Sequence, residues 1–208
     1  MIRIMITIID YGVGNIFAFQ NVYKRLNIPS RIAKCENDLK DVDKLILPGV
    51  GHFDYAMTQL NNSGMRDRLD ELVKVEKKYI VGICVGMQMM ARKSEEGILD
   101  GLGWIDAEVK KFDESTINYH TKLPHMGWND VTPNENHPLF KDLEHEAIFY
   151  FLHSFYFKCS NKNNIIAKTH YGINFSSSVQ HENIYGIQFH PEKSHSYGEK
   201  LLENFSKL

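Results

Sequence analysis

The first half of the chain alternates short apolar runs with amphipathic stretches. The apolar runs predict strands that are covered on both faces, at Ile4–Ile9, Ser30–Lys34, Lys44–Leu47 and Tyr79–Ile83. The amphipathic stretches have apolar residues at helical spacing and predict helices at Ile16–Leu26, Phe53–Lys77 and Gly86–Arg92. Strands and helices that alternate with short connections predict a parallel sheet with helices on both faces.

The pattern changes after Gly97, where strand-like segments follow one another between turn-rich stretches. These segments predict strands at Trp104–Phe112, Asp130–Thr132, Ile148–Phe157, Ile165–Thr169, Ser176–Gln180 and Tyr185–Gln188. A final helix is predicted over Tyr197–Phe205. We find no repeat, low-complexity tract or flexible linker, so we expect the second half to complete the same sheet with added antiparallel strands. Residues 1–208 are therefore predicted to form a single domain.

Composition and charge narrow the class of protein. Hydrophobic residues make up 43% and charged residues 24% of the 208 residues, with a formal net charge of −2. This balance is typical of a soluble globular protein and indicates no nucleic-acid-binding or membrane-binding surface. The apolar N-terminus runs directly into Asp10 and is interpreted as a strand rather than a signal peptide, and no apolar run approaches the roughly 20 residues that span a bilayer.

The cysteines point to a reducing environment. Cys35, Cys84 and Cys159 are odd in number and have no metal-ligand spacing, and the histidines have none either, so we expect a cytoplasmic protein without a bound metal. Cys35 and Cys159 lie in no recognisable motif and are interpreted as structural.

Cys84 lies where the strand predicted over Tyr79–Ile83 meets a helix. In Gly82-Ile-Cys-Val-Gly86 a glycine lies two residues away on each side. This is the cysteine form of a strand–turn–helix elbow, a strained turn in which larger flanking side chains would collide. The helix start favours a thiolate, and the N–H of Val85 points to where a tetrahedral oxyanion forms. The alternative is a buried structural cysteine between two packing glycines.

A candidate base lies at the end of the last predicted strand, in Gln188-Phe-His-Pro-Glu192. Residues i and i+2 of an extended chain project to the same side, and Pro191 biases His190 toward the extended conformation. His190 can then take the thiol proton, while Glu192 holds the imidazole tautomer and stabilises its charged form. The alternative is a loop turn with a surface ion pair.

Seven segments give the chain a resemblance to a known family. They are Asp10-Tyr-Gly-Val-Gly-Asn15, Leu47-Pro-Gly-Val-Gly-His-Phe53, Gly82-Ile-Cys-Val-Gly-Met-Gln88, Ser94-Glu-Glu-Gly97, Gly101-Leu-Gly103, Pro124-His-Met-Gly-Trp-Asn129 and Gln188-Phe-His-Pro-Glu-Lys-Ser194. With them the chain resembles the class I (triad) glutamine amidotransferases over nearly its whole length. The sixth and seventh segments are typical of the glutaminase subunits of imidazole glycerol phosphate synthase. The resemblance implies a flavodoxin-like α/β fold with a mostly parallel central sheet, helices on both faces and added antiparallel strands.

The resemblance also implies a role for each residue of the triad. Cys84 attacks the amide carbon of glutamine and forms a γ-glutamyl thioester, His190 is the general acid and base, and Glu192 orients His190. The products are glutamate and ammonia, and no cofactor is implied.

An oxyanion hole and a substrate pocket are implied in the same way. The residues expected to form the oxyanion hole are Gly49, Val50, Gly51 and Val85, and the glycines allow the loop to rearrange when a synthase binds. The residues expected to contact glutamine are Gln88, Glu96, His153 and Ser154. A carboxylate at Glu96 would suit the α-ammonium group of glutamine, although a solvated acid at a helix end is an alternative.

In this family the partner is a (β/α)₈-barrel cyclase whose interior conducts the ammonia, so the resemblance implies a heterodimer. The residues expected on the docking face are Asn15, Met126, Trp128 and Lys193. Tryptophan is favoured at the centre of interfaces, yet Trp128 could also be a core residue and Lys193 a simple surface charge. Transfer of ammonia requires a pocket mouth that is sealed against bulk water, which makes an obligate interface physically sensible.

The chain departs from the family pattern at three places. Phe155 stands where tyrosine is usual, so a hydroxyl is missing near the pocket. Val85 stands where leucine is common, and Ala91-Arg-Lys93 replaces a more apolar and acidic helix end.

The sequence leaves two candidates for the enzyme that receives the ammonia. One is the histidine-pathway cyclase that makes imidazole glycerol phosphate and AICAR, and the other is a synthase that makes an amino sugar for surface polysaccharide. Two further functions are alternatives. One is a catalytically silent binding module, against which the intact triad argues. The other is a stand-alone cysteine hydrolase of γ-glutamyl substrates, which would be fully active without a partner.

Overall fold

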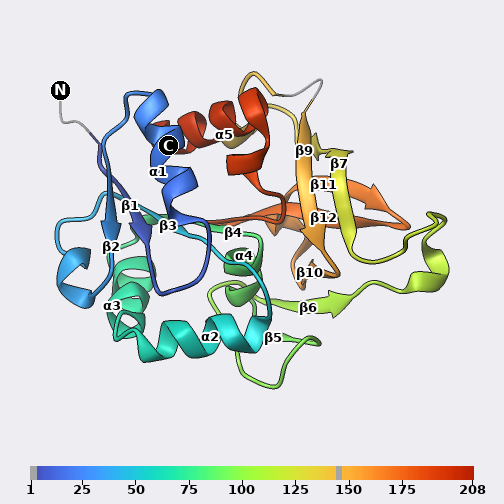
Figure 1. Ribbon diagram of the computed structural model, residues 1–208, viewed down its shortest axis with the longest axis horizontal. Helices are drawn as coiled ribbons and strands as arrows, with labels where there is room; N and C mark the ends of the chain where they lie inside the picture. The colour runs from blue at the N-terminus through green and yellow to red at the C-terminus, as the bar shows by residue number, and fades with distance from the viewer. Residues whose placement is uncertain (1–3, 144–146) are drawn as a thin grey trace.

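The computed structural model describes residues 4–143 and 147–208, and a large sheet runs through its centre (Figure 1). Its strands are β1 (Ile6–Ile9), β2 (Ser30–Ala33), β3 (Lys44–Leu47), β4 (Tyr79–Ile83), β5 (Lys93–Ser94), β6 (Ala107–Lys111), β8 (Thr132–Pro133), β10 (Phe155–Cys159), β11 (Ile165–Tyr171), β12 (Ile173–His181) and β13 (Ile184–Ile187). They are arranged in the order β2-β1-β3-β4-β13-β12-β10-β6-β5, with β11 paired to β12 and β8 paired to β11.

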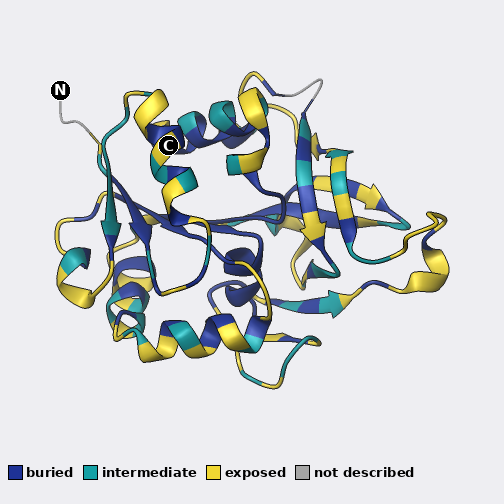
Figure 2. Ribbon diagram, in the orientation of Figure 1, coloured by how far each residue is buried: buried dark blue, intermediate teal, exposed yellow. Residues whose placement is uncertain are grey.

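Helices cover both faces of this sheet (Figure 1). On one face lie α1 (Ile16–Arg25) and α5 (His195–Lys207), and on the other lie α2 (Phe53–Asn62), α3 (Arg66–Asp70) and α4 (Val85–Met89). The four central strands β1, β3, β4 and β13 are buried almost throughout, because side chains on both of their faces pack against helices (Figure 2). None of the helices in the described ranges is both long and apolar enough to cross a bilayer.

The predicted architecture is confirmed. Strands β2, β1, β3, β4 and β13 pair in parallel, and from β13 onward the sheet continues through antiparallel pairings with β12, β10, β11 and β6. The second half of the chain therefore completes the sheet that the first half begins.

Several element ends differ by a few residues from the sequence-based expectation, and three differences change how the elements are divided or paired. The helix predicted over Phe53–Lys77 is interrupted at Gly64, whose φ of +72° is incompatible with a continuing α-helix, and α3 then continues as a wider helical turn over Glu71–Val75. The strand predicted over Ile148–Phe157 divides at Ser154 into β9 (Ile148–His153) and β10, which belong to different sheets.

The third difference creates a separate two-stranded sheet. A strand was predicted at Asp130–Thr132, but the main strand is β7 (His125–Asp130), which pairs with β9 in antiparallel orientation. Glycine at position 127 weakens the strand signal in the sequence, so the pattern is visible only once β9 lies beside it. One face of this pair is buried and the other presents Met126, Trp128 and Leu152 to solvent.

The topology brings two distant segments together at the carboxyl ends of β4 and β13. These strands are parallel neighbours with Ile83 opposite Ile187. The backbone N–H of Cys84 donates to the carbonyl of Ile187 at 2.8 Å, so the residue after β4 lies against the segment that leads to His190. The carboxyl ends of parallel strands are where α/β sheets bind their ligands.

Candidate active site

Cys84 lies at the elbow between β4 and α4. Its backbone has φ +54° and ψ −113°, a conformation that a non-glycine residue adopts at a cost of roughly 1–3 kcal/mol. The two flanking glycines are needed there: a Cβ on Gly82 would lie 2.6 Å from the Gly86 carbonyl oxygen, and a Cβ on Gly86 would lie 2.0 Å from the Leu47 oxygen. The strained elbow that the sequence predicted is therefore confirmed.

His190 and Glu192 form a buried pair beside this elbow. His190 has an extended backbone, and Pro191 starts the short helical turn Pro191–Lys193. The imidazole Nδ1 lies 2.9 Å from Oε1 of Glu192, and both side chains are almost fully buried. An ionised carboxylate only accepts hydrogen bonds, so Nδ1 carries the proton and Nε2 is the nitrogen available to the thiol.

The charge state of His190 is set by its neighbours. Burial by itself would lower the pKa of His190. Attraction to Cys84 and a hydrogen bond with it, together with the hydrogen bond and charge of Glu192, outweigh burial and raise the pKa of His190 to about 10. The imidazolium form is thus stabilised next to the sulfur, which is the setting in which a cysteine reacts as a thiolate.

Three hydrogen bonds hold the His190 backbone against β9. The His190 N–H donates to the Tyr150 carbonyl at 2.8 Å. The Ser194 hydroxyl donates to the His190 carbonyl at 2.6 Å and accepts from the Tyr150 N–H at 3.0 Å. The sequence places Ser194 in a motif without indicating its role, because its partner Tyr150 belongs to another strand.

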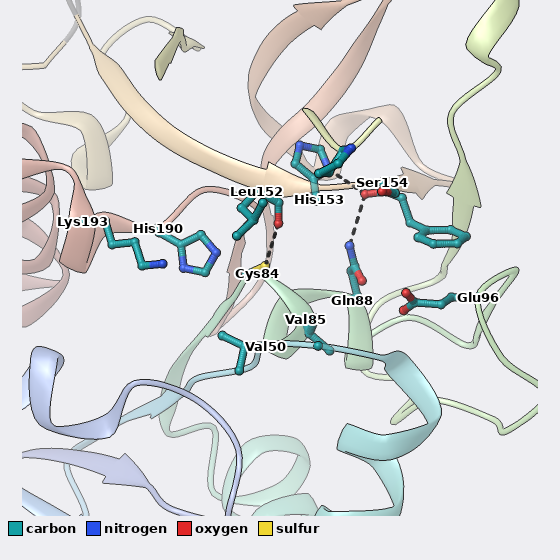
Figure 3. A pocket seen from close by; sticks show the side chains of 13 residues that line it. Val50, Cys84, Val85, Gln88, Glu96, Leu152, His153, Ser154, His190 and Lys193 are labelled. Atoms are coloured by element: carbon teal, nitrogen blue, oxygen red, sulfur yellow. Dashed lines mark hydrogen bonds between the residues drawn. The ribbon is translucent and has the colours of Figure 1, made fainter. Parts of the chain in front are cut away.

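The elbow and His190 open into one pocket of about 310 Å³, at the lower end of the range for small-molecule sites (Figure 3). It is lined by Val50, Gly51, Cys84, Val85, Gln88, Glu96, Pro124, Leu152, His153, Ser154, Phe155, His190 and Lys193. The pocket therefore collects the nucleophile and base candidates, the residues expected to contact substrate, and most of the expected oxyanion hole.

The remaining predicted residues lie around this pocket. Glu192 lies behind His190. Gly49 packs on the elbow, where a Cβ would come within 2.2 Å of the Gly86 nitrogen. Asn15, Met126 and Trp128 are exposed outside the pocket lining, whereas Lys193 is exposed at the pocket itself.

The amide of Gln88 is oriented by two acceptors. Its Nε2 donates to the Phe155 carbonyl at 3.2 Å and to Oε1 of Gln188 at 3.0 Å, so its own Oε1 is left for a ligand. Nε2 of the fully buried Gln188 in turn lies 3.8 Å from the Cys84 sulfur. No function was predicted for Gln188. A polar residue directly after the apolar strand β13 is the signal that could have identified it.

Glu96 is half-buried in the pocket wall and does not point freely into solvent. Its Oε2 accepts the backbone N–H of Phe53, the first residue of α2, at 2.8 Å. One carboxylate oxygen thus stabilises a helix start, where negative charge is favourable, while the side chain still lines the pocket.

The departures from the family pattern leave the pocket largely intact. Phe155 contributes its backbone carbonyl, which does not depend on the missing hydroxyl. Arg92 and Lys93 form surface ion pairs with Asp106 at 2.7 Å and with Glu108 at 3.0 Å, and neither lines the pocket.

The other cysteines lie in different surroundings. Burial, followed by the nearby charge of Asp106, raises the pKa of Cys159 to about 12, so this thiol stays protonated near neutral pH. Cys35 is exposed on the surface. Within the two described ranges, no cluster of three histidine, cysteine or acidic side chains could hold a metal ion.

The fold and the site together define an α/β protein with a candidate cysteine nucleophile at a strand–helix elbow. The family model described as "Glutamine amidotransferase class-I" matches residues 7–208. The chain belongs to this family.

Curated relatives match along almost the whole chain. "Imidazole glycerol phosphate synthase subunit HisH" of Bdellovibrio bacteriovorus is 53% identical over 204 residues, which are 98% of this chain and 100% of the relative. The protein of the same name from Leptospira borgpetersenii is 50% identical over the same shares of the two chains.

Solved structures show the same fold at lower identity. The structure of PurLQS from Thermotoga maritima has a TM-score of 0.74 at 16% identity, covering 98% of each chain. A glutamine amidotransferase from the same organism has a TM-score of 0.66 at 14% identity, covering 100% of this chain and 84% of that one.

Proposed function

We propose that this chain is the glutaminase subunit of an imidazole glycerol phosphate synthase in histidine biosynthesis. It hydrolyses L-glutamine to L-glutamate and ammonia, and it passes the ammonia to a (β/α)₈-barrel cyclase that makes imidazole glycerol phosphate and AICAR. The observation that carries the proposal is Cys84 at a strained elbow with the His190–Glu192 pair beside it in one pocket. Relatives with this subunit name that match over their full length support the assignment. Residues 1–208 act as a single domain in the cytoplasm, and no cofactor takes part.

The geometry supports a two-stage reaction. His190 takes the proton of Cys84, and the thiolate attacks the amide carbon of glutamine. The oxyanion that forms is stabilised by the N–H of Val85 and by the Gly49–Gly51 loop. His190 then gives its proton to the leaving ammonia, which leaves a γ-glutamyl thioester. Water attacks the thioester with His190 as base, and glutamate is released.

The pocket wall supplies the substrate contacts. Oε1 of Gln88 is free to accept a hydrogen bond, and the carboxylate of Glu96 suits the α-ammonium group of glutamine. His153 and Ser154 line the pocket next to Gln88 in Figure 3, where the Ser154 hydroxyl and the backbone of this segment offer polar groups to the substrate.

The docking face for the cyclase consists of Asn15, Met126, Trp128 and Lys193. Met126 is 62% and Trp128 45% exposed on the outer face of β7, which is a large apolar surface to leave in water. Lys193 lines the pocket, and its Nζ lies 5.6 Å from the centre of the Tyr150 ring. Tyr150 is in turn the residue opposite Trp128 in the β7–β9 pair. A partner on this surface would cover the mouth and keep ammonia from bulk water.

The direct test is a glutaminase assay on the purified chain, alone and with its cognate cyclase and the cyclase substrate. Cys84→Ala should reduce glutamate release by about 10³-fold or more and leave cyclase binding intact. Cys159→Ala is the matched control and should retain the parent rate. Release of glutamate by Cys84→Ala at the parent rate would refute the nucleophile assignment.

The same assay separates the competing functions. Strong stimulation by the cyclase supports the subunit function, whereas full turnover without any partner would identify a stand-alone hydrolase. The acceptor is tested by complementation of a strain that lacks its histidine-pathway glutaminase subunit. Failure with the cognate cyclase present would contradict the histidine-pathway role and favour an amino-sugar synthase as acceptor.

A further inference from the structure

Two buried histidines face each other between the docking strand and the pocket. His125 on β7 lies directly opposite His153 on β9, and both are almost fully buried. His153 also lines the glutamine pocket, while Met126, the residue after His125, lies on the outer face. The pair therefore lies between the exposed docking face and the reaction site.

The hydrogen bonds of this pair determine both tautomers. Nδ1 of His153 lies 2.7 Å from the Phe155 carbonyl, which can only accept, so Nδ1 carries the proton. Nε2 of a neutral His153 is then an acceptor, and its partner, Nδ1 of His125 at 2.9 Å, must donate. Both rings are thus Nδ1–H tautomers.

The hydrogen bonds of Asn129, which lies beside His125, agree with these tautomers. Nε2 of His125 is left as an acceptor and lies 3.1 Å from Nδ2 of Asn129. The same amide nitrogen donates to the His170 carbonyl at 3.0 Å, and Oδ1 of Asn129 accepts the Asp130 N–H at 2.8 Å. Every donor meets an acceptor only when both rings are neutral.

The surroundings also favour neutral rings. Burial lowers the pKa of His125 to about 4. Burial, followed by the neighbouring His125, lowers the pKa of His153 to about 3 against the opposing effect of its bond to Phe155. The His125 ring stacks on Tyr171 with ring centres 4.0 Å apart and on Phe151 at 4.6 Å.

The inner end of the hydrogen-bond series reaches the nucleophile. The Phe155 carbonyl accepts from Nδ1 of His153 and also from Nε2 of Gln88. Gln88 donates to Gln188, whose amide nitrogen faces the sulfur of Cys84. The Phe155 carbonyl therefore connects the histidine pair to the side-chain amides of Gln88 and Gln188, which lie beside Cys84. It also holds Gln88 so that its Oε1 remains available to the substrate.

We propose that His125 and His153 are positioning residues for glutamine hydrolysis, which as neutral Nδ1–H tautomers hold the Phe155 carbonyl, and through it Gln88 and Gln188, in one orientation beside Cys84. The inference rests on the proposed function and adds to it. Both ring nitrogens of His153 are engaged within the protein, so its ring acts through Phe155 and not by contact with glutamine.

Nitrogen-15 NMR of the histidine-labelled full chain tests the tautomers without relying on activity. At pH 7 both His125 and His153 should carry their proton on Nδ1. A proton on Nε2 of His153, or an imidazolium at either position, overturns the proposal. This result is independent of the proposed function, which stands or fails with the Cys84→Ala assay.

Kinetics test the positioning role. His125→Leu removes the donor to His153 and should lower kcat/KM for glutamine by about 10- to 100-fold, because small displacements of positioning groups have effects of this size. His125→Asn keeps an N–H near the position of Nδ1 and should recover most of the loss. His137→Leu is the control: it removes a half-buried histidine, bonded to Gln180 at 2.8 Å outside the pocket lining, and should leave kcat/KM unchanged.

The variants also separate a positioning role from a purely structural one. The proposal is wrong if His125→Leu retains the parent kcat/KM. It is equally wrong if His125→Asn fails to recover activity although its unfolding midpoint matches that of His137→Leu. If His125→Leu does not fold, the NMR measurement on the unaltered chain still decides.

Discussion

The Tyr11 hydroxyl donates a 2.7 Å hydrogen bond to the carbonyl oxygen of Pro48. This bond joins the turn after β1 to the first residue of the loop that runs over the Cys84 elbow. The two segments pack closely, since a Cβ on Gly14 would lie 2.7 Å from the Pro48 side chain. Burial, followed by the nearby Cys84, raises the pKa of Tyr11 far above its ordinary value, so the hydroxyl remains a donor at any pH of interest.

Tyr11→Phe should therefore impair the loop without disturbing the pocket lining. The Pro48 carbonyl would lose its partner, which costs roughly 1–3 kcal/mol of stability. We expect kcat for glutamine to fall by about three- to tenfold with little change in KM, because the loop contributes to the oxyanion site rather than to ground-state binding. Tyr23→Phe is the control. It removes an equally buried hydroxyl, bonded to the Leu202 carbonyl at 3.3 Å, and should reduce stability but not kcat. An equal loss of kcat in both variants would contradict the prediction.

Ser194→Ala should disturb His190 itself. The change removes the hydroxyl that bonds both the His190 carbonyl and the Tyr150 N–H. The Tyr150 N–H then loses its acceptor, which costs roughly 1–3 kcal/mol, whereas the His190 carbonyl keeps the Lys193 N–H at 3.1 Å. We expect a fall in kcat as well, because the imidazole would no longer be held against β9. Denaturant unfolding and a glutaminase assay measure the two effects. The control Ser178→Ala removes a hydroxyl bonded to the Gly186 carbonyl at 3.0 Å within the sheet and should affect stability alone.

Gly49→Ala should be severely destabilising, because its Cβ would lie 2.2 Å from the Gly86 nitrogen and 2.8 Å from the Val85 carbonyl carbon. Backbone atoms at the elbow cannot move aside cheaply, so we expect a loss of roughly 3 kcal/mol or more. Gly64→Ala meets no atom within 4 Å and has only the cost of a φ of +72°, roughly 1–2 kcal/mol. Urea denaturation of the two variants should reproduce this order, and the reverse order would show that the elbow is not packed as described.

The two neutral histidines should make the protein sensitive to mild acid. In the unfolded chain a histidine gains its proton near pH 6.5, whereas in the folded protein the pKa of His125 is about 4 and that of His153 about 3. The unfolded state therefore binds more protons below pH 6.5, and stability falls as the pH decreases toward 4. At pH 5 each of the two histidines should lower the free energy of unfolding by on the order of 2 kcal/mol relative to its value above pH 7.

Urea unfolding between pH 7 and pH 5 measures this dependence. His125→Asn removes one of the two groups and should flatten the slope. An unchanged slope in His125→Asn would show that His125 is not held neutral.

Much of the fold could be predicted from local pattern. The bounds of β3 and β4 agree with the apolar runs that predicted them, because buried parallel strands require nearly continuous aliphatic residues. The break at Gly64 and the division at Ser154 could not be placed. A glycine within a helical pattern does not reveal its φ, and nothing in the run from Ile148 to Phe157 shows that its two halves pair with different neighbours.

The candidate site divides in the same way. Cys84 between two glycines and His190 before Pro191 are local arrangements, so the candidate nucleophile and base could be predicted from the sequence. The roles of Tyr11, Gln188 and Ser194 depend on hydrogen bonds to Pro48, Cys84 and Tyr150, which are distant along the chain.

The sequence by itself determined the class of fold, the elbow and the candidates for the reactive residues, because these depend on periodicity, on glycine spacing and on side-chain type over a few positions. Only the tertiary structure decided which partners the ring nitrogens of His125, His153 and His190 meet, where the chain passes from one sheet to the other, and which groups surround Cys84 and His190. Such features are set by a donor and an acceptor brought together from separate strands, and their distance is a property of packing that no local pattern contains.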